Sequence, residues 1–382
     1  MPNLYVVGPL PFLDRSSSGV SVHSLANSLS ESGRRVLVVA QRGAWRNPSA
    51  KYEQAEVWQP GYGCFSSIYR FLIKKRARRV GIQHEMFMYG KLRVNALFLI
   101  FLVMCRLSGI RIVTTLHHAL PNAEVRRILA EGAYTRRELI PVLLLGYRFF
   151  NFSVKLLSSA LILPYETGGS VFARSERVRV SSVPLVAVRT RVEGSEIERV
   201  RTKYSLPENY VLSFGFLSKY KGVEHVIAAA QALSDRIPFA AVAGRNVRQA
   251  VEPDYLRYYE RLRAQATRAG VRWLDYIPEM DMEPVLKGCR LLVLPYVAFH
   301  GASGTLTTGA SLGVPILVSR VMEVPEFSEV AIEPSAASLT SAIERFLNDP
   351  AYAVAVLQAS RRYRLSHSTE IVTRGYASAL DA

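Results

Sequence analysis

A loop of small residues in the last third of this 382-residue chain has the composition of an anion-binding site. The loop, HGASG at 300–304, lies between an apolar run at 291–295 that fits a buried strand and a helix-length segment at 305–312. Gly and Ser before a helix leave backbone N–H groups free, and the positive end of the helix dipole attracts an anion. The pattern indicates a phosphate-bearing ligand, although an ordinary strand–helix–strand crossover has the same appearance.

A serine-rich loop near the N-terminus has a similar character. Ser16-Ser17-Ser18-Gly19 ends a polar stretch between a strand expected at 4–7 and a helix expected over 20–31. Gly19 has no side chain, so the backbone there can approach a phosphate closely. The formal G-x-G-x-x-G fingerprint is absent, and a dinucleotide site is therefore weakly supported.

Histidines follow two of the expected strands. His84 and Glu85 come at the end of a strand around 81–84, and His117 follows a strand at 111–115. Ligands of open α/β sheets collect at the carboxyl ends of strands, so these side chains are candidates for binding or catalysis. A histidine that is hydrogen-bonded within a loop is the structural alternative in both places.

The elements that would position these groups form two successive α/β series. Strands and helices alternate from residue 4 and, after a polar stretch at 186–208, alternate again from residue 210. Alternation of this kind predicts parallel sheets, and the length of the chain favours two domains. We expect an N-terminal Rossmann-like domain over 1–187, a C-terminal Rossmann-like domain over 188–365 and a last helical segment over 366–382.

The positive charge is concentrated in the first half of the chain. Residues 1–185 hold 25 Lys and Arg against 10 Asp and Glu, which is +15 of the total net charge of +17. An anionic membrane face attracts such a surface with about 1 kcal/mol for each basic residue close to it. No helix-turn-helix, zinc-finger or RNA-binding motif accompanies the charge, so we expect no nucleic acid. Scattered solubilising charge is the alternative.

The rest of the composition narrows the class of protein. Hydrophobic residues make up 49% of the chain and charged residues 21%, as in globular proteins. The three cysteines have no metal-type spacing, which suits packed thiols in a reducing compartment. The N-terminus lacks a basic signal region, and the longest apolar run, of about ten residues, is too short to span a bilayer. We therefore expect a cytoplasmic protein, peripheral on the inner face of the plasma membrane.

Taken in order, the motifs resemble those of the GT-B glycosyltransferases, and specifically the family 4, or group 1, retaining enzymes. The segments that carry the resemblance are SGVSVHSLANSLSESGRRVLVVA at 18–40, RIVTTLHHALP at 111–121, FGFLSKYKGVEHVIAAAQAL at 214–233, YIPEMDMEPVLKGCRLLVLPY at 276–296 and GASLGVPILVSRVMEVPEF at 309–327. The resemblance covers nearly the whole chain. It implies the α/β GT-B architecture, with two Rossmann-like domains facing a central cleft and a last helix that crosses back to the first domain.

The resemblance also implies a role for each candidate residue. Lys221 is expected beside the diphosphate of the donor, and His117 beside the transferring sugar, which makes both catalytic candidates. The donor-binding candidates are Gly19, Gly215, Lys221, Gly222, Arg245, His300, Gly301, Ser303, Gly304, Thr305 and Thr308. His84 and Glu85 are expected to orient the acceptor or the donor, and Glu323 or Glu326 to contact ribose. The structural alternatives are a surface lysine in a turn for Lys221 and helix capping for Ser303.

The implied reaction is transfer of a hexose from a nucleoside diphosphate sugar to a hydroxyl acceptor, with retention of configuration. A lipid-linked or saccharide acceptor, in surface polysaccharide or glycolipid synthesis, would suit the basic first half. No metal and no other cofactor is expected, because Arg, Lys and helix N-termini hold the diphosphate in this family. The chain has no Asp-x-Asp, and Glu279-Met280-Asp281 is better interpreted as the start of a helix.

Two departures from the family pattern bear on this prediction. Phe216 stands where the family has an arginine, and His300 and Thr308 stand where it has the two glutamates of E-x7-E. QHE at 83–85, FGFLSKYKG at 214–222 and GASG at 301–304 are similar to a subset of members that lack E-x7-E. The departures leave open a GT-B protein without transferase activity, such as a binding or regulatory subunit, and a GT-B enzyme of another chemistry, such as an epimerase or phosphorylase.

Overall fold

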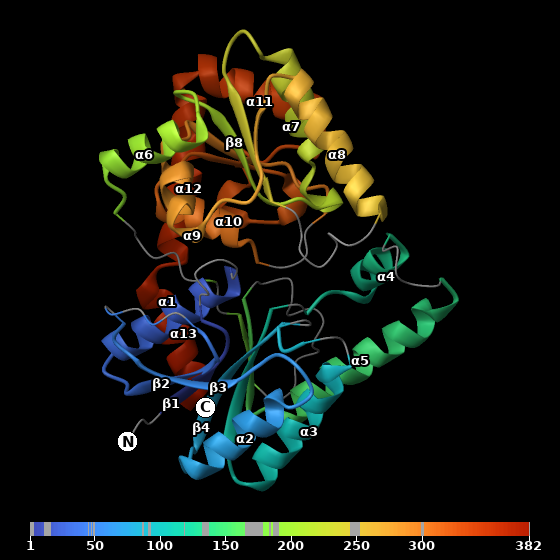
Figure 1. Cartoon of the computed structure of the whole chain (residues 1–382), viewed down its shortest axis with the longest axis vertical. Helices are drawn as coiled ribbons and strands as arrows, with labels where there is room; N and C mark the ends of the chain where they lie inside the picture. The colour runs from blue at the N-terminus through green and yellow to red at the C-terminus, as the bar shows by residue number, and fades with distance from the viewer. Residues whose placement is uncertain are drawn as a thin grey trace. The chain divides into compact units, whose positions relative to one another are not determined.

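A computed structural model describes residues 4–10, 17–44, 46, 48, 50–85, 88–90, 93–117, 119–131, 137–164, 179–182, 185, 191–244, 253–298 and 302–381. The chain divides into two compact units. Unit 1 comprises Met1–Val186, His300–Ala302 and Thr369–Ala382, and unit 2 comprises Ala187–Phe299 and Ser303–Ser368. Each unit is built on a parallel sheet of its own (Figure 1).

The sheet of unit 1, sheet A, has the strand order β3-β2-β1-β4-β5-β6-β7, and its strand pairs are parallel. The strands are β1 (Leu4–Val7), β2 (Val36–Gln41), β3 (Glu53–Trp58), β4 (Arg79–His84), β5 (Arg111–Leu116), β6 (Ala160–Leu163) and β7 (Arg179–Ser182). The strand order reverses between β1 and β4. Open α/β sheets bind their ligands at such a reversal, at the carboxyl ends of the strands.

Helices cover both faces of sheet A, because successive strand residues point to opposite faces. One layer holds α1 (Ser17–Glu31) and α13 (Thr369–Asp381), and the other holds α2 (Cys64–Lys74), α3 (Val94–Leu107) and α5 (Ile140–Leu157) (Figure 1). In β1, for example, Val6 packs in the core with α1 and α13, whereas Val7 packs in the core with α2 and α3. A short helix, α4 (Asn122–Glu131), packs on α5.

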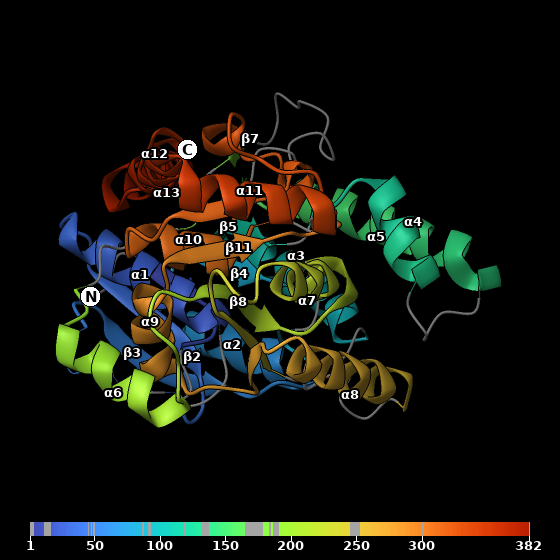
Figure 2. The ribbon, with the colours of Figure 1, turned by 90° about the horizontal axis from the view of Figure 1, so that it is seen from above.

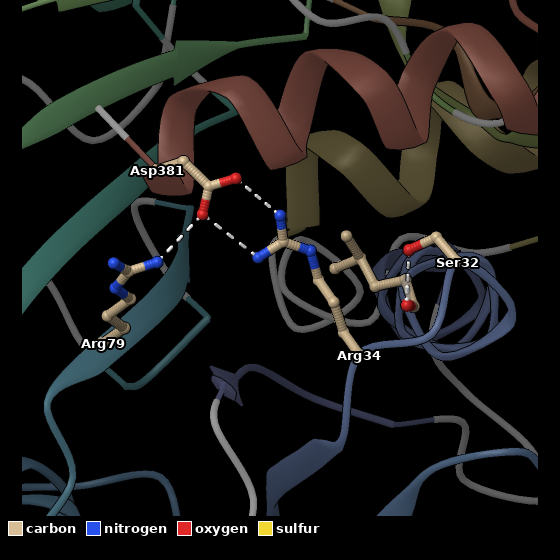
Figure 3. A network of polar contacts seen from close by, with 5 residues as sticks. Ser32, Arg34, Arg79 and Asp381 are labelled. Atoms are coloured by element: carbon tan, nitrogen blue, oxygen red, sulfur yellow. Dashed lines mark hydrogen bonds and ion pairs between the residues drawn. The ribbon is translucent and has the colours of Figure 1, made fainter.

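The last helix, α13, comes from the far end of the chain and is fastened to unit 1. Asp381 lies between Arg34 and Arg79, with N–O distances of 2.7 and 2.9 Å (Figure 3). The hydrogen bond from Arg34, together with the charges of both guanidinium groups, holds the pKa of the Asp381 carboxyl below its usual range. Val372 and Tyr376 of α13 are buried against the sheet. The helix therefore completes a layer that the first half of the chain leaves open.

The sheet of unit 2, sheet B, has the strand order β10-β9-β8-β11-β12 and is also parallel. Its strands are β8 (Val211–Phe216), β9 (Phe239–Gly244), β10 (Arg272–Leu274), β11 (Leu291–Leu294) and β12 (Ile316–Val318). These are the runs of apolar and β-branched residues that a sheet buried on both faces requires. Here the order reverses between β8 and β11.

The helices of unit 2 again form two layers, seen in Figures 1 and 2. One side of the sheet carries α7 (Val223–Ala232), α8 (Pro253–Arg268) and α11 (Ala336–Asn348). The other side carries α6 (Gly194–Tyr204), α9 (Glu279–Gly288), α10 (Gly304–Ser311) and α12 (Pro350–Ser366). The prediction that Glu279-Met280-Asp281 starts a helix is confirmed, because α9 begins at Glu279.

A buried carboxylate joins α6 to α9. The side chain of Asp281 is fully buried, and Arg199 and Lys203 of α6 each lie 2.7 Å from one of its oxygens. Burial by itself would raise the pKa of Asp281, but hydrogen bonds from Lys203, Tyr204 and Arg199 outweigh it and lower the pKa to about 2. This carboxylate is thus an internal ion-pair partner in unit 2.

Helix α1 and strand β3 differ from the sequence prediction, and α4 and α6 lie in segments for which no helix was predicted. Helix α1 begins at Ser17, so Gly19 lies in its first turn and not in a loop before it. Serines are tolerated there because the first N–H groups of a helix have no partner within it. Strand β3 was not predicted, since its alternating Glu and Gln are unusual in a sheet buried on both faces; it lies at the edge of sheet A, where polar residues are favoured.

Candidate functional site

The carboxyl end of β8, where sheet B reverses, brings together three candidate residues. Gly215 has φ of 134°, and a Cβ atom built there would lie 2.1 Å from Lys221 Nζ and 3.8 Å from Thr305 Oγ1. The ammonium group therefore occupies the space that any side chain at 215 would need. A cation, a glycine backbone and the first turn of α10 meet at one point.

Tight backbone packing fixes the loop that carries Lys221. Gly222 has φ of 64°, and a Cβ atom built there would lie 2.2 Å from the carbonyl oxygen of Pro295, directly after β11. The backbone N–H of Val297 donates to the carbonyl of Tyr220 at 2.8 Å. Only glycine fits this approach, so the loop after β8 is held against the end of the neighbouring strand.

The side chain of Lys221 is held beside an aromatic pair. Its Nζ lies 5.8 Å from the centre of the Tyr296 ring, and the rings of Tyr220 and Tyr296 meet edge to face at 5.6 Å. Burial acts to lower the pKa of Lys221, but the hydroxyl groups of Tyr296 and Tyr220 more than offset it and raise the pKa above its usual range. Lys221 is therefore a fixed cation at neutral pH.

The start of α10 is rigid. Ser303 caps the helix, its Oγ accepting a hydrogen bond from the Leu306 N–H at 3.2 Å. Thr307 Oγ1 donates to the Ser303 carbonyl at 3.0 Å and lies 3.1 Å from the hydroxyl of Tyr363 on α12. The N–H groups of Gly304 and Thr305 have no acceptor within the helix, as in the first turn of any helix. Gly313, directly after the helix, has φ of 71°, a backbone conformation that favours glycine.

This arrangement suits a diphosphate. The ammonium of Lys221 supplies a positive charge, and the first turn of α10 supplies N–H groups and the positive end of a helix dipole. Thr308 lies one turn after Thr305 on the same face of α10. Across the part of the chain that the structure describes, no group of three His, Cys, Asp or Glu side chains could hold a metal ion.

The reversal point of sheet A is built from side chains that bond to one another. Gln83, at the end of β4, donates from Nε2 to Thr115 Oγ1 at 3.1 Å, and its Oε1 lies 2.9 Å from His117 Nε2. Because the amide nitrogen already donates, its oxygen is the acceptor and His117 Nε2 the donor. Thr115 Oγ1 lies 3.1 Å from the hydroxyl of Tyr376 on α13.

His84 has a different environment from the one expected. Its side chain is 4% exposed, and its ring stacks on Phe98 with centroids 4.4 Å apart and lies 5.3 Å from Phe150. The ring is therefore part of the aromatic core of unit 1, and any influence on an acceptor would be indirect. Glu85 follows it and is partly buried.

Comparison with known proteins finds a family match within unit 2. Residues 208–349 match a protein-family model described as Glycosyl transferases group 1. The matched segment contains Gly215, Lys221 and Thr305. The segment is similar to a group 1 glycosyl transferase domain. No curated protein sequence matches the chain.

Solved structures extend the likeness to the whole chain. Sucrose-phosphate synthase from Thermosynechococcus elongatus has 14% identity and a TM-score of 0.70, over 98% of this chain and 97% of that one. HepE from Anabaena, in complex with UDP and glucose, has 13% identity and a TM-score of 0.69 over 100% of both chains. WaaG, a glycosyltransferase involved in lipopolysaccharide biosynthesis, has 16% identity and a TM-score of 0.65 over 99% of both. The chain has the GT-B fold, as the sequence predicted.

Some of the predicted site residues lie elsewhere than in the two groups. Gly19 is buried in the first turn of α1, in unit 1. Arg245, His300 and Gly301 lie outside the described residues, so their expected roles remain predictions.

Sequence reasoning missed three contributors to these groups, namely Thr115, Tyr296 and Tyr376. Thr115 and Tyr296 lie at or just after the end of a strand, which is a usable signal. Nothing local marks Tyr376, because it reaches Thr115 from 261 residues further along the chain.

Proposed function

We propose that this GT-B protein transfers a hexose from a nucleoside diphosphate sugar to a hydroxyl acceptor, without a metal ion and with retention of configuration. The observation that carries the proposal is the convergence of Gly215, Lys221 and Thr305 at the strand reversal of sheet B. A similar chain, HepE from Anabaena, is described in complex with UDP-glucose. A uridine diphosphate sugar is therefore the first donor to test.

Lys221 would act on the leaving group. Negative charge grows on the nucleoside diphosphate as the glycosidic bond breaks, and a fixed ammonium nearby stabilises it more in the transition state than in the ground state. The N–H groups of Gly304 and Thr305 would add hydrogen bonds to the phosphate oxygens. Gly215 would serve the donor site by leaving room for the ammonium of Lys221, and Gly222 by letting the Lys221 loop pack against the end of β11. Ser303 would contribute by holding the first turn of α10, and Thr308 by facing the sugar. Arg245, His300 and Gly301 complete the expected donor contacts.

Unit 1 would supply the acceptor side. His117, oriented by Gln83, would bind a sugar hydroxyl or the developing charge at the reacting carbon. A covalent double displacement needs a carboxylate nucleophile. The residues proposed here beside the diphosphate and the transferring sugar include no carboxylate, which favours front-face attack assisted by the leaving diphosphate.

The acceptor would be a lipid-linked or saccharide hydroxyl, used in surface polysaccharide or glycolipid synthesis. The basic first half of the chain supports a peripheral place on an anionic membrane. WaaG, which is similar over nearly the whole chain, is described as involved in lipopolysaccharide biosynthesis. The binding or regulatory subunit without transferase activity remains the second candidate function, because the two glutamates of E-x7-E are replaced.

A screen of nucleoside diphosphate sugars tests the proposal. Each donor is added alone, with thermal shift reporting binding and release of the nucleoside diphosphate reporting slow hydrolysis. We expect one base and one sugar to stand out, and an acceptor to accelerate release. The anomeric configuration of the product, measured by NMR, tests retention. Binding without hydrolysis or transfer would favour the non-enzymatic candidate, and no binding at all would contradict the proposed donor site.

A further inference from the structure

Helix α5 presents a continuous apolar stripe to solvent. Val142, Leu145, Phe149, Phe152 and Leu156 follow one another at spacings of three and four residues, which places them on one helical face. Their exposed fractions lie between 52% and 67%. The opposite face, with Tyr147, Asn151 and Val154, is buried in unit 1. The helix therefore lacks the polar outer face of an ordinary surface helix, because its exposed face is as apolar as its buried one.

Helix α3 widens this surface. Its exposed apolar side chains are Ile100, Val103, Met104 and Leu107. The two helices pack side by side, since Phe98 of α3 and Phe150 of α5 have ring centroids 6.2 Å apart, and Arg106 Nη1 donates to the Leu156 carbonyl at 3.0 Å. We call the nine exposed side chains of the two helices the α3/α5 face. Contiguous exposed apolar surfaces of this kind mark interaction sites.

Within the helices of this layer, α2, α3 and α5, the charge has one sign. The sequences of α2, α3 and α5 contain no Asp or Glu. Exposed basic residues lie along the same helix layer, and they are Arg70, Lys74, Arg93, Arg106 and Arg148, followed by Lys75, Arg76 and Arg78 after α2. An apolar strip bordered by cations is complementary to an anionic lipid surface, where apolar groups enter the acyl boundary and cations meet the headgroups. A second copy would place these cations opposite themselves.

The helix lies on unit 1 and is not free to cross a bilayer. By length and composition, Ile140–Leu157 is the helix among the described residues that could span a membrane, contrary to the expectation drawn from the longest apolar run. It connects the parallel neighbours β5 and β6, and its inner face is packed against α3 and the sheet. A helix so anchored can lie in the plane of an interface, with its outer face turned to lipid.

We propose that the α3/α5 face docks unit 1 on an anionic bilayer surface, with Phe149 and Phe152 at the centre of the inserted strip. The biological role of this docking rests on the proposed function, because docking would bring the enzyme to a lipid-linked acceptor in the membrane. Tyr147 supports this, because its hydroxyl accepts from the Leu120 N–H at 2.6 Å and donates to the Leu120 carbonyl at 3.0 Å. The middle of α5 is thereby fixed to the loop that follows His117.

Co-sedimentation of the full chain with phosphatidylglycerol vesicles, and with phosphatidylcholine vesicles as a reference, tests the docking. We expect binding to the anionic vesicles that weakens with salt, and a fall in partitioning of about tenfold or more for the double variant Phe149→Ser/Phe152→Ser. The matched control is Val354→Ser/Leu365→Ser on α12 of unit 2, where both side chains are similarly exposed; it should bind as the unchanged protein does. Arg148→Gln should weaken binding to anionic vesicles only.

Further readouts separate the alternatives. A tryptophan introduced as Phe149→Trp should shift its emission to the blue with vesicles, whereas no shift would overturn insertion. A concentration-dependent dimer in sedimentation velocity, abolished by Phe149→Ser/Phe152→Ser, would overturn the lipid assignment in favour of a second copy. Lys221→Ala should keep vesicle binding, and Phe149→Ser/Phe152→Ser should keep hydrolysis of a soluble donor. The docking proposal and the proposed function can therefore fail independently.

Discussion

The two points at which the strand order reverses, one in each sheet, are formed by different chemical groups. In unit 2 the point between β8 and β11 is made of glycine backbone, a helix start and the ammonium of Lys221. In unit 1 the point between β1 and β4 is a chain of hydrogen-bonded side chains, His117, Gln83, Thr115 and Tyr376. The first offers N–H groups and positive charge, whereas the second offers a positioned imidazole.

The difference separates two kinds of recognition on similar scaffolds. A diphosphate carries its charge on many equivalent oxygens, so backbone N–H groups and one cation can hold it without a specific side-chain pattern. A hydroxyl group is small and neutral, so it needs a donor or acceptor at a defined place and angle. We expect changes in unit 2 to affect every donor reaction, and changes in unit 1 to affect transfer to the acceptor alone.

The largest effect should come from Lys221→Ala. Loss of the ammonium removes the charge that stabilises the departing diphosphate, and donor hydrolysis should fall by about 100-fold or more. Release of nucleoside diphosphate measures this. Lys219→Ala, which removes an exposed lysine from the same turn, is the control and should leave the rate unchanged. Equal rates for the two variants would mean that the donor is bound elsewhere.

Gly215→Ala should have the second-largest effect on turnover. The added methyl would lie 2.1 Å from Lys221 Nζ, so the ammonium must move, and we expect turnover to fall by about tenfold. Gly270→Ala is the matched control, because it also has positive φ, at 70°, but meets nothing within 4 Å. Both variants should lose about 1 kcal/mol of stability from backbone strain. A loss of turnover in both would show that strain, and not the lysine, is responsible.

Gln83→Leu should slow transfer to the acceptor without affecting hydrolysis of the donor. The variant removes the acceptor of the His117 Nε2 hydrogen bond, and transfer to acceptor should fall by about tenfold, in line with the loss of a buried hydrogen-bond network. Hydrolysis of the donor should not change. Gln54→Leu, on the edge strand β3, serves as the control. If Gln83→Leu slowed hydrolysis and transfer equally, the division of roles between the units would be wrong.

The buried carboxylate of unit 2 should show a marked pH dependence. Asp281→Asn removes the charge that Arg199 and Lys203 share, at an expected cost of about 2 kcal/mol in the free energy of unfolding at pH 7. Because the folded pKa of Asp281 is lowered to about 2, its contribution is present above the usual Asp range and is lost as pH falls towards 2. Urea unfolding at several pH values measures the difference, which should shrink on acidification; a constant difference would contradict the ion-pair assignment.

The exposed carboxylate of unit 1 should matter least. Asp381 is half exposed, so its pairs with Arg34 and Arg79 are screened, and Asp381→Asn should cost below about 1 kcal/mol. Because the pKa of Asp381 is also lowered, its contribution to the free energy of unfolding has the same pH dependence as that of Asp281 and is lost as pH falls below the usual Asp range. High salt should erase the effect of Asp381→Asn and leave most of that of Asp281→Asn. A larger effect for Asp381 would mean that α13 depends on this contact.

Local pattern was sufficient for the backbone of the donor group. An apolar run and a small-residue loop before a helix-length segment predicted β11 and α10 nearly to the residue, because helix and strand patterns act over a few positions. The same local rules placed Lys221 between glycines in a loop. They also predicted that Glu279-Met280-Asp281 opens a helix.

The partners across the sheets were decided by tertiary structure alone. The sequence predicted His84 and His117 as two polar candidates at strand ends. Only the strand order and the packing of the helices placed His84 in the aromatic core and His117 within hydrogen-bond distance of Gln83. Tyr376 reaches Thr115 because α13 returns to unit 1, a contact that no local pattern encodes. The α3/α5 face is of the same kind, since a sequence shows that a helix is apolar, and only packing shows which of its sides is left uncovered.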